Sequence, residues 1–581
     1  MEKNTQKEVL LIFKTHLDIG FTDFSRTVIE RYLNDYLPAA IRVGYELRGT
    51  ETPFIWTVGS WLIMEALKRD PDGTVEQAVR DGILSWHGLP FTTHTELEDP
   101  HLFRLGLEIS RSLDRRFGTH TTGAKMTDVP GHTIGMVPLM REAGLAFLHL
   151  GVNPATPIPK VPELFRWKCG EDEITVMYEG DYGLDADFGD FAVCFAHTGD
   201  NRGPQSAENI VECYRKAQEK FPGAHVRAAT LNDIAERVGG LRDLPVVTDE
   251  IGDTWIHGAG TDPMKVSHYR SLLRKLRDEA ITDERLWDNL LLVPEHTWGM
   301  DQKTYFRDDT HYFPAELKET EGTENRRKFE ASWEEQRSFV KEAEDLLGVK
   351  EPWCTESFDE TGFAEVPVTD DPAAPEIFWQ VFDRSDYERY EKDYMRLVVD
   401  WSVWDFTKVG MPDIKGFTVK ASPVKMLEKG DARITHLRFD APAEYGLPEL
   451  SLYTCGDTVE IRWSGMKQSR LPQACFVRFP GMTANFRVRK MGQEIDPYHV
   501  IGSPYLMACE DTVTGNGWQI TTLDAPLVLP FGRRLLQYAK GLPAKDLAQD
   551  LHFCLYDNIW NTNFPMWYGD DAAFRFTLKK N

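Results

Sequence analysis

Short apolar runs alternate with amphipathic stretches through the first part of the chain. Apolar or β-branched runs, three of them ending in Gly, Pro or His, lie at residues 9–13, 53–60, 82–90, 121–131, 145–153 and 191–197. Apolar residues at helical spacing mark the stretches 27–47, 61–70, 100–118, 133–144 and 206–221. The alternation predicts a largely parallel sheet, either barrel-like or open and doubly wound. In both architectures ligands bind at the carboxyl ends of the strands.

The pattern changes after about residue 258. Residues 263–280 and 325–348 repeat apolar positions at helical spacing, and the second stretch ends at Gly348. Both stretches predict long amphipathic helices of a small bundle. Their charged faces are typical of the solvated side of such helices.

Beyond residue 372 the apolar runs become short and often alternate with polar residues. Residues 514–518, TGNGW, contain the Asn-Gly pair that favours a tight hairpin turn. We therefore expect a multidomain α/β, α and β protein. It would have a (β/α) barrel-like domain at 1–258, a helical bundle at 259–372 and a mainly antiparallel β-sandwich at 373–581.

The length of the chain supports this layout, and its net charge argues against some classes of partner. A chain of 581 residues exceeds one compact core, and about three or four domains are usual for that length. The net charge of −26 argues against nucleic acid and anionic membranes as partners, because phosphate binding needs concentrated Lys and Arg. The apolar start is too short for a signal peptide, and no run approaches a membrane span.

The eight cysteines are scattered and form no Cys-x-x-Cys pair. A thiolate zinc site is therefore not expected, and reduced cysteines in a cytoplasmic protein are the simplest interpretation. Association into a homo-oligomer remains open at this point.

Metal-capable or acidic side chains follow apolar runs at four places. His16 and Asp18 follow the first run, Asp128 closes another, Asp200 lies in a glycine-bounded loop, and His296 follows residues 290–294. Two imidazoles and two carboxylates would suit zinc. They could meet only if the fold gathers strand ends, as the alternating architecture does.

Each residue also has an ordinary structural interpretation. His16 and Asp18 are spaced like a surface or capping pair, and Asp128 could cap the helix that starts near residue 133. Asp200 is a typical turn aspartate, and His296 could be a hydrogen-bonded structural histidine. The spacing alone leaves both kinds of interpretation open.

Taken in order, these segments resemble glycoside hydrolase family 38, the α-mannosidase family, and more closely an uncharacterised bacterial group related to it. Residues 16–21 resemble its His-x-Asp-x-Gly-aromatic motif, and residues 128–132 its Asp-x-x-Gly-His motif. Residues 199–204 resemble a glycine-rich loop followed by Pro, and 249–263 a His-Gly-containing segment. His296 is the best match to a late metal-binding histidine.

The resemblance implies one zinc ion bound by His16, Asp18, Asp128 and His296. Asp128 would also be the nucleophile of a retaining glycosidase, and Asp200 is the candidate general acid. The expected activity is hydrolysis of α-linked sugars.

The resemblance also suggests residues that contact the substrate. Phe21 stands where the family usually has Trp, so it would line the sugar subsite with His132. Further candidates are Asp253, His257 and Trp298.

Two other functions fit the same architecture. A metal-dependent carbohydrate deacetylase would use zinc to activate water without forming a covalent sugar intermediate. A carbohydrate-binding protein would have kept the architecture and lost catalysis.

Overall fold

The computed structural model describes residues 6–281, 283–286, 289–349, 353, 357–482, 484–538 and 546–580. The chain divides into two compact units. The first comprises residues 1–94, 102–130 and 134–248, and the second comprises 95–101, 131–133 and 249–581. The second unit therefore contains both the expected helical bundle and the expected β region. The expected boundaries at 258 and 372 stay predictions.

The first unit contains eleven described strands, which form two sheets. The strands are β1 (Glu8–His16), β2 (Trp56–Gly59), β3 (Leu84–His87), β4 (Gly123–Asp128), β5 (Phe147–Val152), β6 (Leu164–Cys169), β7 (Asp172–Glu179), β8 (Ala186–Asp187), β9 (Phe191–Asp200), β10 (His225–Ala228) and β11 (Val246–Val247). One sheet has the order β3-β2-β1-β9-β8, with β10 also paired to β1. The other has the order β11-β6-β7-β5-β4.

Most ladders in these two sheets are parallel, as the alternating pattern predicts. The exceptions are the antiparallel pairs β6–β7 and β8–β9. Strands β6, β7, β8, β10 and β11 were not predicted from the sequence. Closure of the two sheets into a barrel-like domain stays a prediction.

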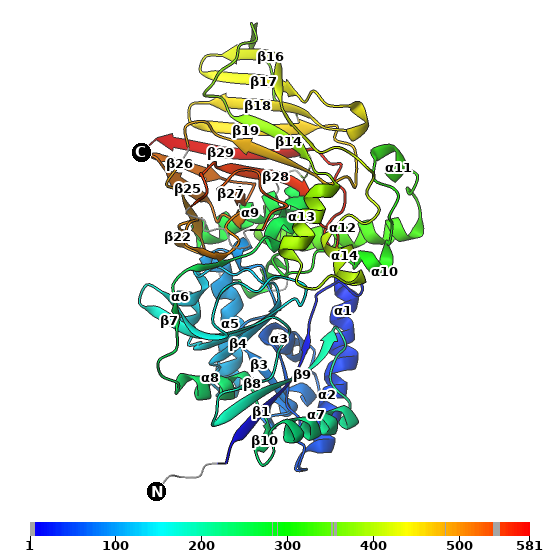
Figure 1. Ribbon diagram of the computed structural model, residues 1–581, viewed down its shortest axis with the longest axis vertical. Coiled ribbons are helices and arrows are strands. Elements are labelled where there is room, and N and C mark those ends of the chain that lie inside the picture. The colour runs from blue at the N-terminus through cyan, green and yellow to red at the C-terminus, as the bar shows by residue number, and fades with distance from the viewer. Residues whose placement is uncertain are drawn as a thin grey trace. The chain divides into compact units, whose positions relative to one another are not determined.

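Helices connect these strands. They are α1 (Ser25–Arg31), the π-helical turn η1 (Tyr32–Tyr36), α2 (Leu37–Leu47), α3 (Ser60–Lys68), α4 (Thr74–Arg80), α5 (Pro100–Phe117), α6 (Met136–Glu142), α7 (Ala207–Lys220) and α8 (Leu231–Gly239). Helices α2 and α7 pack side by side, and α7 also contacts β1 (Figure 1). Each stretch expected to be helical in this region contains a helix.

Strand β1 lies in the middle of its sheet, and its residues 9–13 are apolar on both faces. Residues 9–16 are all buried, and β1 pairs in parallel with β2, β9 and β10. A strand covered on both faces reads as a continuous apolar run, unlike the alternating pattern of a half-exposed strand. Its carboxyl end therefore lies inside the unit.

One apolar cluster joins the two sheets of the first unit. Leu10 and Ile12 of β1 pack in the same cluster as Phe147 of β5 and Met177 of β7, and Ile234 of α8 covers it. All five side chains are fully shielded from solvent. Burial of each such side chain contributes about 1.5–3 kcal/mol, so this cluster fixes the two sheets against each other.

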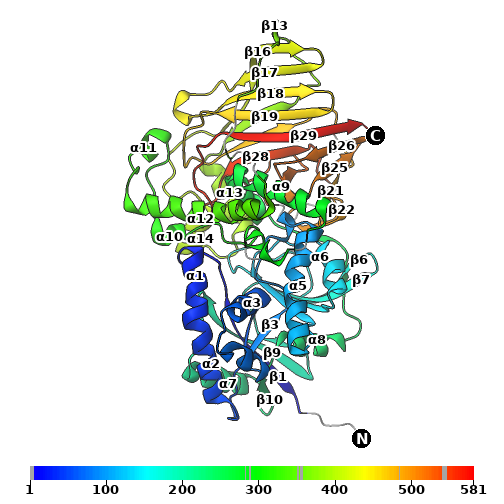
Figure 2. The ribbon, with the colours of Figure 1, turned by 180° about the vertical axis from the view of Figure 1, so that it is seen from behind.

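The second unit contains the two long helices that the sequence predicts. Its helices are η2 (Thr95–Leu97), η3 (Trp255–Thr261), α9 (Pro263–Glu279), η4 (Glu284–Leu286), η5 (Leu290–Leu292), α10 (Gln302–Tyr305), α11 (Pro314–Lys318), α12 (Glu324–Leu347), α13 (Arg384–Tyr394), α14 (Asp400–Phe406) and η6 (Ala443–Tyr445). Helices α9 and α12 pack against each other (Figure 2). The Asp262 side chain accepts a hydrogen bond from the backbone N–H of Lys265 at the start of α9. At the carboxyl end of α12, Gly348 has a φ of 66°, which suits a glycine cap.

The rest of the second unit is mainly antiparallel β structure, as expected. Its strands are β12 (Glu250–Gly252), β13 (Ala364–Val366), β14 (Glu376–Val381), β15 (Phe417–Lys420), β16 (Ser422–Lys429), β17 (Ala432–Arg438), β18 (Glu449–Cys455), β19 (Thr458–Ser464), β20 (Gln473–Arg478), β21 (Arg487–Lys490), β22 (Gln493–Ile495), β23 (Val500–Gly502), β24 (Met507–Ala508), β25 (Thr512–Gly515), β26 (Trp518–Thr522), β27 (Leu527–Leu529), β28 (His552–Asn558) and β29 (Ala572–Lys580). A ten-stranded and a six-stranded sheet contain most of them. The sandwich arrangement of these sheets stays a prediction.

The Asn-Gly hairpin is confirmed. Strands β25 and β26 are antiparallel, with Gly515 opposite Trp518. Asn516 and Gly517 between them have φ angles of 50° and 74°. Two successive positive φ angles are what a type I′ turn requires.

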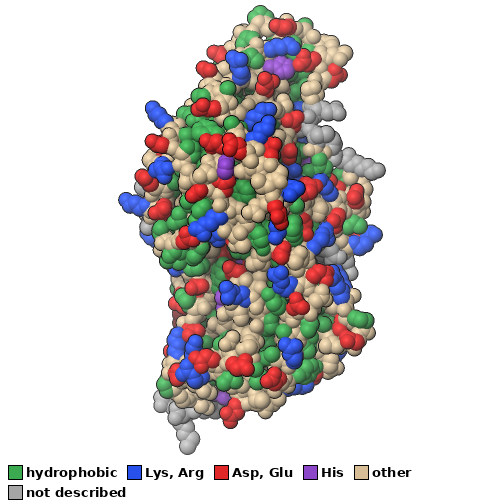
Figure 3. All heavy atoms as spheres, turned by 90° about the vertical axis from the view of Figure 1, so that its right-hand side faces the viewer, with side chains coloured by type: hydrophobic (Ala, Val, Ile, Leu, Met, Phe, Trp, Pro, Cys, Tyr) green, Lys and Arg blue, Asp and Glu red, His purple; other side chains and the backbone are tan. Residues whose placement is uncertain are grey.

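Charged side chains of both signs are interspersed on the face drawn in Figure 3. Among the residues that the structure describes, no helix combines the length and apolar character needed to cross a bilayer.

A buried ion cluster ties three distant segments of the second unit together. Lys490 of β21 lies 2.7 Å from a carboxylate oxygen of Glu96 and also contacts Glu250. The three side chains are almost completely buried. Burial disfavours the charge on Lys490, but the carboxylates of Glu250 and Glu96 outweigh it and raise the pKa of Lys490. The second unit therefore depends on this cation.

We predict that Lys490→Met destabilises the second unit by about 3–5 kcal/mol, because it leaves two buried carboxylates without their cation. Denaturant unfolding followed by tryptophan fluorescence would measure the loss. Lys420→Met is the matched control: Lys420 is exposed and lies 3.3 Å from Glu376, so its removal should cost less than about 1 kcal/mol. Equal effects of the two substitutions would contradict the structural role of the cluster.

Candidate metal centre and active site

Three side chains meet at the carboxyl ends of two neighbouring strands in the first unit. His16 ends β1, Asp200 ends β9, and the two residues are opposite each other in the parallel ladder. Asp18 follows two residues after His16. One ligand atom from each of the three side chains lies within 4.8 Å of the others. The fold thus brings together the first and third of the places predicted from sequence.

The His16 ring is oriented by a hydrogen bond from the other sheet. Its Nδ1 lies 2.7 Å from Oγ1 of Thr127 on β4, and its Nε2 lies 3.1 Å from Oδ1 of Asp18. With Nδ1–H donating to the Thr127 hydroxyl, Nε2 is the nitrogen with a lone pair for a cation. Imidazoles that bind metals are commonly held in this way.

Asn201 holds the loop that carries Asp18. Its Oδ1 accepts from the Asp18 backbone N–H at 3.0 Å, and its Nδ2 donates to the Asp18 carbonyl at 3.0 Å. The Asn201 backbone N–H in turn donates to the carbonyl of His16. Within the loop, Gly20 has a φ of 130°, a conformation that other residues avoid. This explains why a glycine follows the His-x-Asp pair.

Asp128 lies at the end of β4 in a strained backbone conformation. Its φ is 86°, which is unusual for any residue except glycine. Asn153 Nδ2 and Tyr182 Oη both donate to Asp128 Oδ1, at 2.9 Å and 2.5 Å. An Asp128 carboxylate oxygen also lies within 4.8 Å of a His16 ring nitrogen. Strain of this kind costs about 1–3 kcal/mol and is concentrated at functional sites.

The N-cap residue of the following helix, α6, is Gly135 and not Asp128. Burial of Tyr182, reinforced by the charge of Asp128, raises the pKa of Tyr182 well above its ordinary value. The phenol thus stays protonated and remains a donor to the carboxylate.

A cluster of buried polar side chains belongs to the same unit. Lys14 and Lys125 are buried, and burial lowers the pKa of both, that of Lys125 to about 8. His149 Nε2 lies 2.8 Å from a Glu179 carboxyl oxygen. Burial lowers the pKa of His149 and raises that of Glu179 to about 8, so at neutral pH the two form a hydrogen-bonded pair without net charge.

The donor set fits a divalent cation such as zinc. One imidazole nitrogen and carboxylate oxygens are ordinary zinc ligands at about 2.0–2.2 Å. Ligands around one such ion lie about 3.3–3.6 Å from each other, which is compatible with the 4.8 Å limit that the grouped atoms satisfy. The His16 and Asp18 atoms, 3.1 Å apart, need only a small separation to accept it.

The other predicted residues occupy defined places. Phe21, in the first unit, has a φ of 58° and is partly exposed. His296 lies in the second unit, is buried, and has its Nδ1 2.6 Å from Glu295 Oε1. His132 is also in the second unit, where its backbone N–H donates to the carbonyl of Ile251.

Three further candidates are held by contacts within the second unit. Asp253 accepts hydrogen bonds from the backbone N–H of Trp255 and from Tyr394 Oη, and burial raises the pKa of Asp253 to about 7. The His257 ring lies edge-on to Trp560 at 3.9 Å between centroids. Trp298 is buried, with the Lys265 ammonium 3.7 Å from its ring centroid.

Several site residues were not identified from the sequence. Thr127, Asn153, Tyr182 and Asn201 position the candidate ligands and nucleophile, as described above. Asn153 and Asn201 directly follow β5 and β9, and Tyr182 lies three residues after β7. A search for polar residues after every strand, amides and phenols included, would have found these three.

Comparisons with solved structures identify the fold. An α-mannosidase from Enterococcus faecalis V583 matches with a TM-score of 0.60 and 10% identity, over 99% of this chain and 87% of that one. A glycosyl hydrolase family 38 protein from Enterococcus faecalis matches with a TM-score of 0.56 and 10% identity, over 99% and 86%. The chain therefore has the multidomain fold of family 38 α-mannosidases, and the resemblance stated from the motifs is confirmed at that level.

Sequence comparisons add one match. The profile of a domain of unknown function, DUF5054, matches residues 259–351. No curated protein sequence matches the chain.

We predict that Glu179→Gln changes the pH dependence of stability. Because burial raises the Glu179 pKa from 4.5 to about 8, the folded chain holds a proton that the unfolded chain releases between these values. Wild-type stability should therefore fall relative to the variant as pH rises through this window, by at most about 1.4 kcal/mol per pH unit. Chemical denaturation at pH 5, 6, 7 and 8 would measure the difference.

Glu171→Gln is the control for this comparison, because Glu171 is exposed in the turn of the β6–β7 hairpin. Its stability difference from wild type should stay constant with pH. A constant difference for Glu179→Gln as well would contradict a buried, protonated carboxyl group.

Proposed function

We propose that this protein is a metal-dependent retaining glycoside hydrolase acting on α-linked sugars, with α-mannosidase-like chemistry. The observation that carries the proposal is the meeting of His16, Asp18 and Asp200 within 4.8 Å, with Asp128 also within reach of His16. The α-mannosidase fold supports it, because it provides an architecture suited to such a site.

One zinc ion would be held by His16, Asp18, Asp128 and His296. When bound, zinc would keep the carboxylate of Asp128 ionised and provide positive charge near the sugar hydroxyls. The Thr127 hydrogen bond would keep the His16 ring in place.

Asp128 would attack the anomeric carbon and form a glycosyl-enzyme while the bond to the leaving oxygen breaks. Tyr182 and Asn153 donate to one oxygen, Oδ1, and so orient the other oxygen for attack. Both donors are fixed before substrate binds, which lowers the cost of reaching the reactive geometry.

Asp200 would transfer its proton to the leaving oxygen and then take one from the water that cleaves the intermediate. Its grouping with His16 and Asp18 also suits a metal ligand. A carboxylate bound to a cation is ionised and cannot serve as the acid. The two possible roles of Asp200 therefore predict different results for the same substitution, and an experiment can separate them.

The substrate would be a carbohydrate. Phe21, His132, Asp253, His257 and Trp298 remain our candidates for contacts to the sugar. A cytoplasmic location and a homo-oligomer are further parts of the proposal.

We predict about one zinc per chain in the wild type, and a metal affinity at least tenfold lower in Asp18→Ala. Plasma mass spectrometry after dialysis against a zinc buffer would measure both. Asp23→Ala, a substitution in the same loop at a residue bonded to Arg31, should keep its metal. Equal zinc in Asp18→Ala and wild type would contradict the ligand assignment.

Asp200→Asn tests the role of Asp200 in the same assay. If Asp200 is the general acid, the Asp200→Asn variant keeps its zinc, hydrolyses aryl glycosides with good leaving groups, and loses activity on those with poor leaving groups. If Asp200 is a metal ligand, the variant loses its zinc and its activity on all substrates together.

We predict that a 2-fluoro glycosyl fluoride labels Asp128. The 2-fluoro group slows both formation and breakdown of the intermediate, while the fluoride leaving group speeds its formation, so the intermediate accumulates. Peptide mass spectrometry should then find the sugar on the peptide that contains Asp128. Asp128→Asn should give no adduct. Release of acetate from acetylated sugars without any adduct would favour the deacetylase instead.

A further inference from the structure

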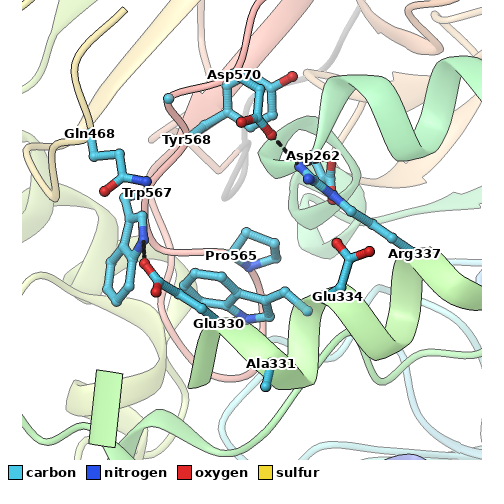
Figure 4. Close-up of a pocket in the computed structure, with 12 residues that line it drawn as sticks. Asp262, Glu330, Ala331, Glu334, Arg337, Gln468, Pro565, Trp567, Tyr568 and Asp570 are labelled. Atoms are coloured by element: carbon cyan, nitrogen blue, oxygen red, sulfur yellow. Dashed lines mark hydrogen bonds and ion pairs between the residues drawn. The ribbon is translucent and has the colours of Figure 1, made fainter. Parts of the chain in front are cut away.

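The second unit contains a cavity of about 380 Å³ between helix α12 and the loop that follows β28 (Figure 4). Trp333, Glu334 and Arg337 line it from α12, and Trp567 and Asp570 line it from the loop. These α12 residues recur at helical spacing, so one face of the helix forms one wall. We call this cavity the α12 pocket.

The aromatic part of the α12 pocket is rigid. The rings of Trp333 and Trp567 pack edge to face, with 4.8 Å between centroids. Trp567 Nε1 donates to Glu330 Oε1 at 3.1 Å, and the Arg326 guanidinium lies 5.1 Å from the Trp567 ring centroid. Trp333 and Trp567 are only 7% and 4% exposed, so they offer the pocket a small aromatic surface that is fixed before a ligand binds.

Opposite charges around the pocket largely compensate each other. Arg337 pairs with Asp262 at 2.7 Å and with Asp570 at 2.9 Å. Glu330 pairs with Arg326 at 3.0 Å, and Glu334 pairs with Lys341. Four carboxylates face three cations, so the net charge around the pocket is small. A ligand therefore does not need a strong charge to bind there.

Polar groups remain accessible beside the rings. The side chains of Glu334 and Asp570 are 57% and 55% exposed. Figure 4 shows Glu334 and Arg337 extending from the helix on one side of the hollow, with Trp567 and Gln468 on the other. Planar acceptors and donors next to aromatic carbon suit a ligand that has both hydroxyl groups and an apolar C–H surface.

We propose that the α12 pocket binds one saccharide unit, as a site separate from the candidate metal centre. Hydroxyl groups would donate to Glu334 and Asp570 and accept from Arg337, while ring C–H groups contact the small exposed parts of Trp333 and Trp567. The cavity is at the lower end of the usual range for ligand sites, about 300–1,000 Å³, which suits one or two sugar rings. The choice of a carbohydrate rests on the proposed function.

The test uses the full chain with the Asp18→Ala substitution, so that binding at the metal centre does not contribute. Methyl α-mannopyranoside and methyl α-glucopyranoside are titrated and followed by saturation-transfer NMR. Ala331→Trp fills the pocket from an exposed position on α12. Leu346→Trp places the same side chain at an exposed position of that helix away from the pocket, as the matched control.

We expect at least one glycoside to bind the Asp18→Ala chain and the Leu346→Trp control with equal affinity. Ala331→Trp should lower that affinity at least tenfold. Glu334→Gln, which keeps the shape and removes the charge, should lower it about tenfold, as expected for loss of a charge-assisted hydrogen bond.

Two outcomes would overturn the inference: no saturation transfer to either glycoside in the Asp18→Ala chain, or equal binding in Ala331→Trp and Leu346→Trp. Neither depends on turnover. Failure of the proposed function would instead appear as a wild-type chain without zinc or hydrolysis, whatever the pocket binds.

Discussion

The hydrogen bond between His16 Nδ1 and Thr127 Oγ1 is the contact on which the candidate centre depends. His16 ends β1 in one sheet and Thr127 lies at the end of β4 in the other, so the 2.7 Å bond joins the two strand ends. It fixes the ring so that Nε2 faces Asp18, and it sets His16 beside Asp128. The apolar cluster between the sheets makes this alignment rigid, since packed cores deform little.

The first unit bears a free-energy cost around this bond. Asp128 has a strained backbone, and Lys14, Lys125 and Glu179 lie buried with displaced pKa values. Such costs are retained at functional sites when the surrounding fold over-determines them. A cation bound to the folded chain would offset part of the cost, because ligands that bind the native state stabilise it.

Much of this arrangement could be predicted from local sequence. The buried run of β1, the helices ending near Ala280 and at Gly348, and the Asn516–Gly517 hairpin depend on periodicity and turn chemistry, which act over short distances. The grouping of His16 with Asp200 follows from parallel pairing, since the carboxyl ends of parallel strands share one edge of a sheet.

Other features depend on contacts between segments far apart in the chain, which a single sequence does not encode locally. The two-sheet division, the antiparallel strands β6 and β8, and the Tyr182 bond to Asp128 are of this kind. The most direct test of the account is an anomalous difference map at the zinc absorption edge from crystals grown with zinc. The account predicts one strong peak about 2.0–2.2 Å from His16 Nε2 and from a carboxylate oxygen of Asp18. A map whose zinc peaks all lie away from these two side chains would contradict it.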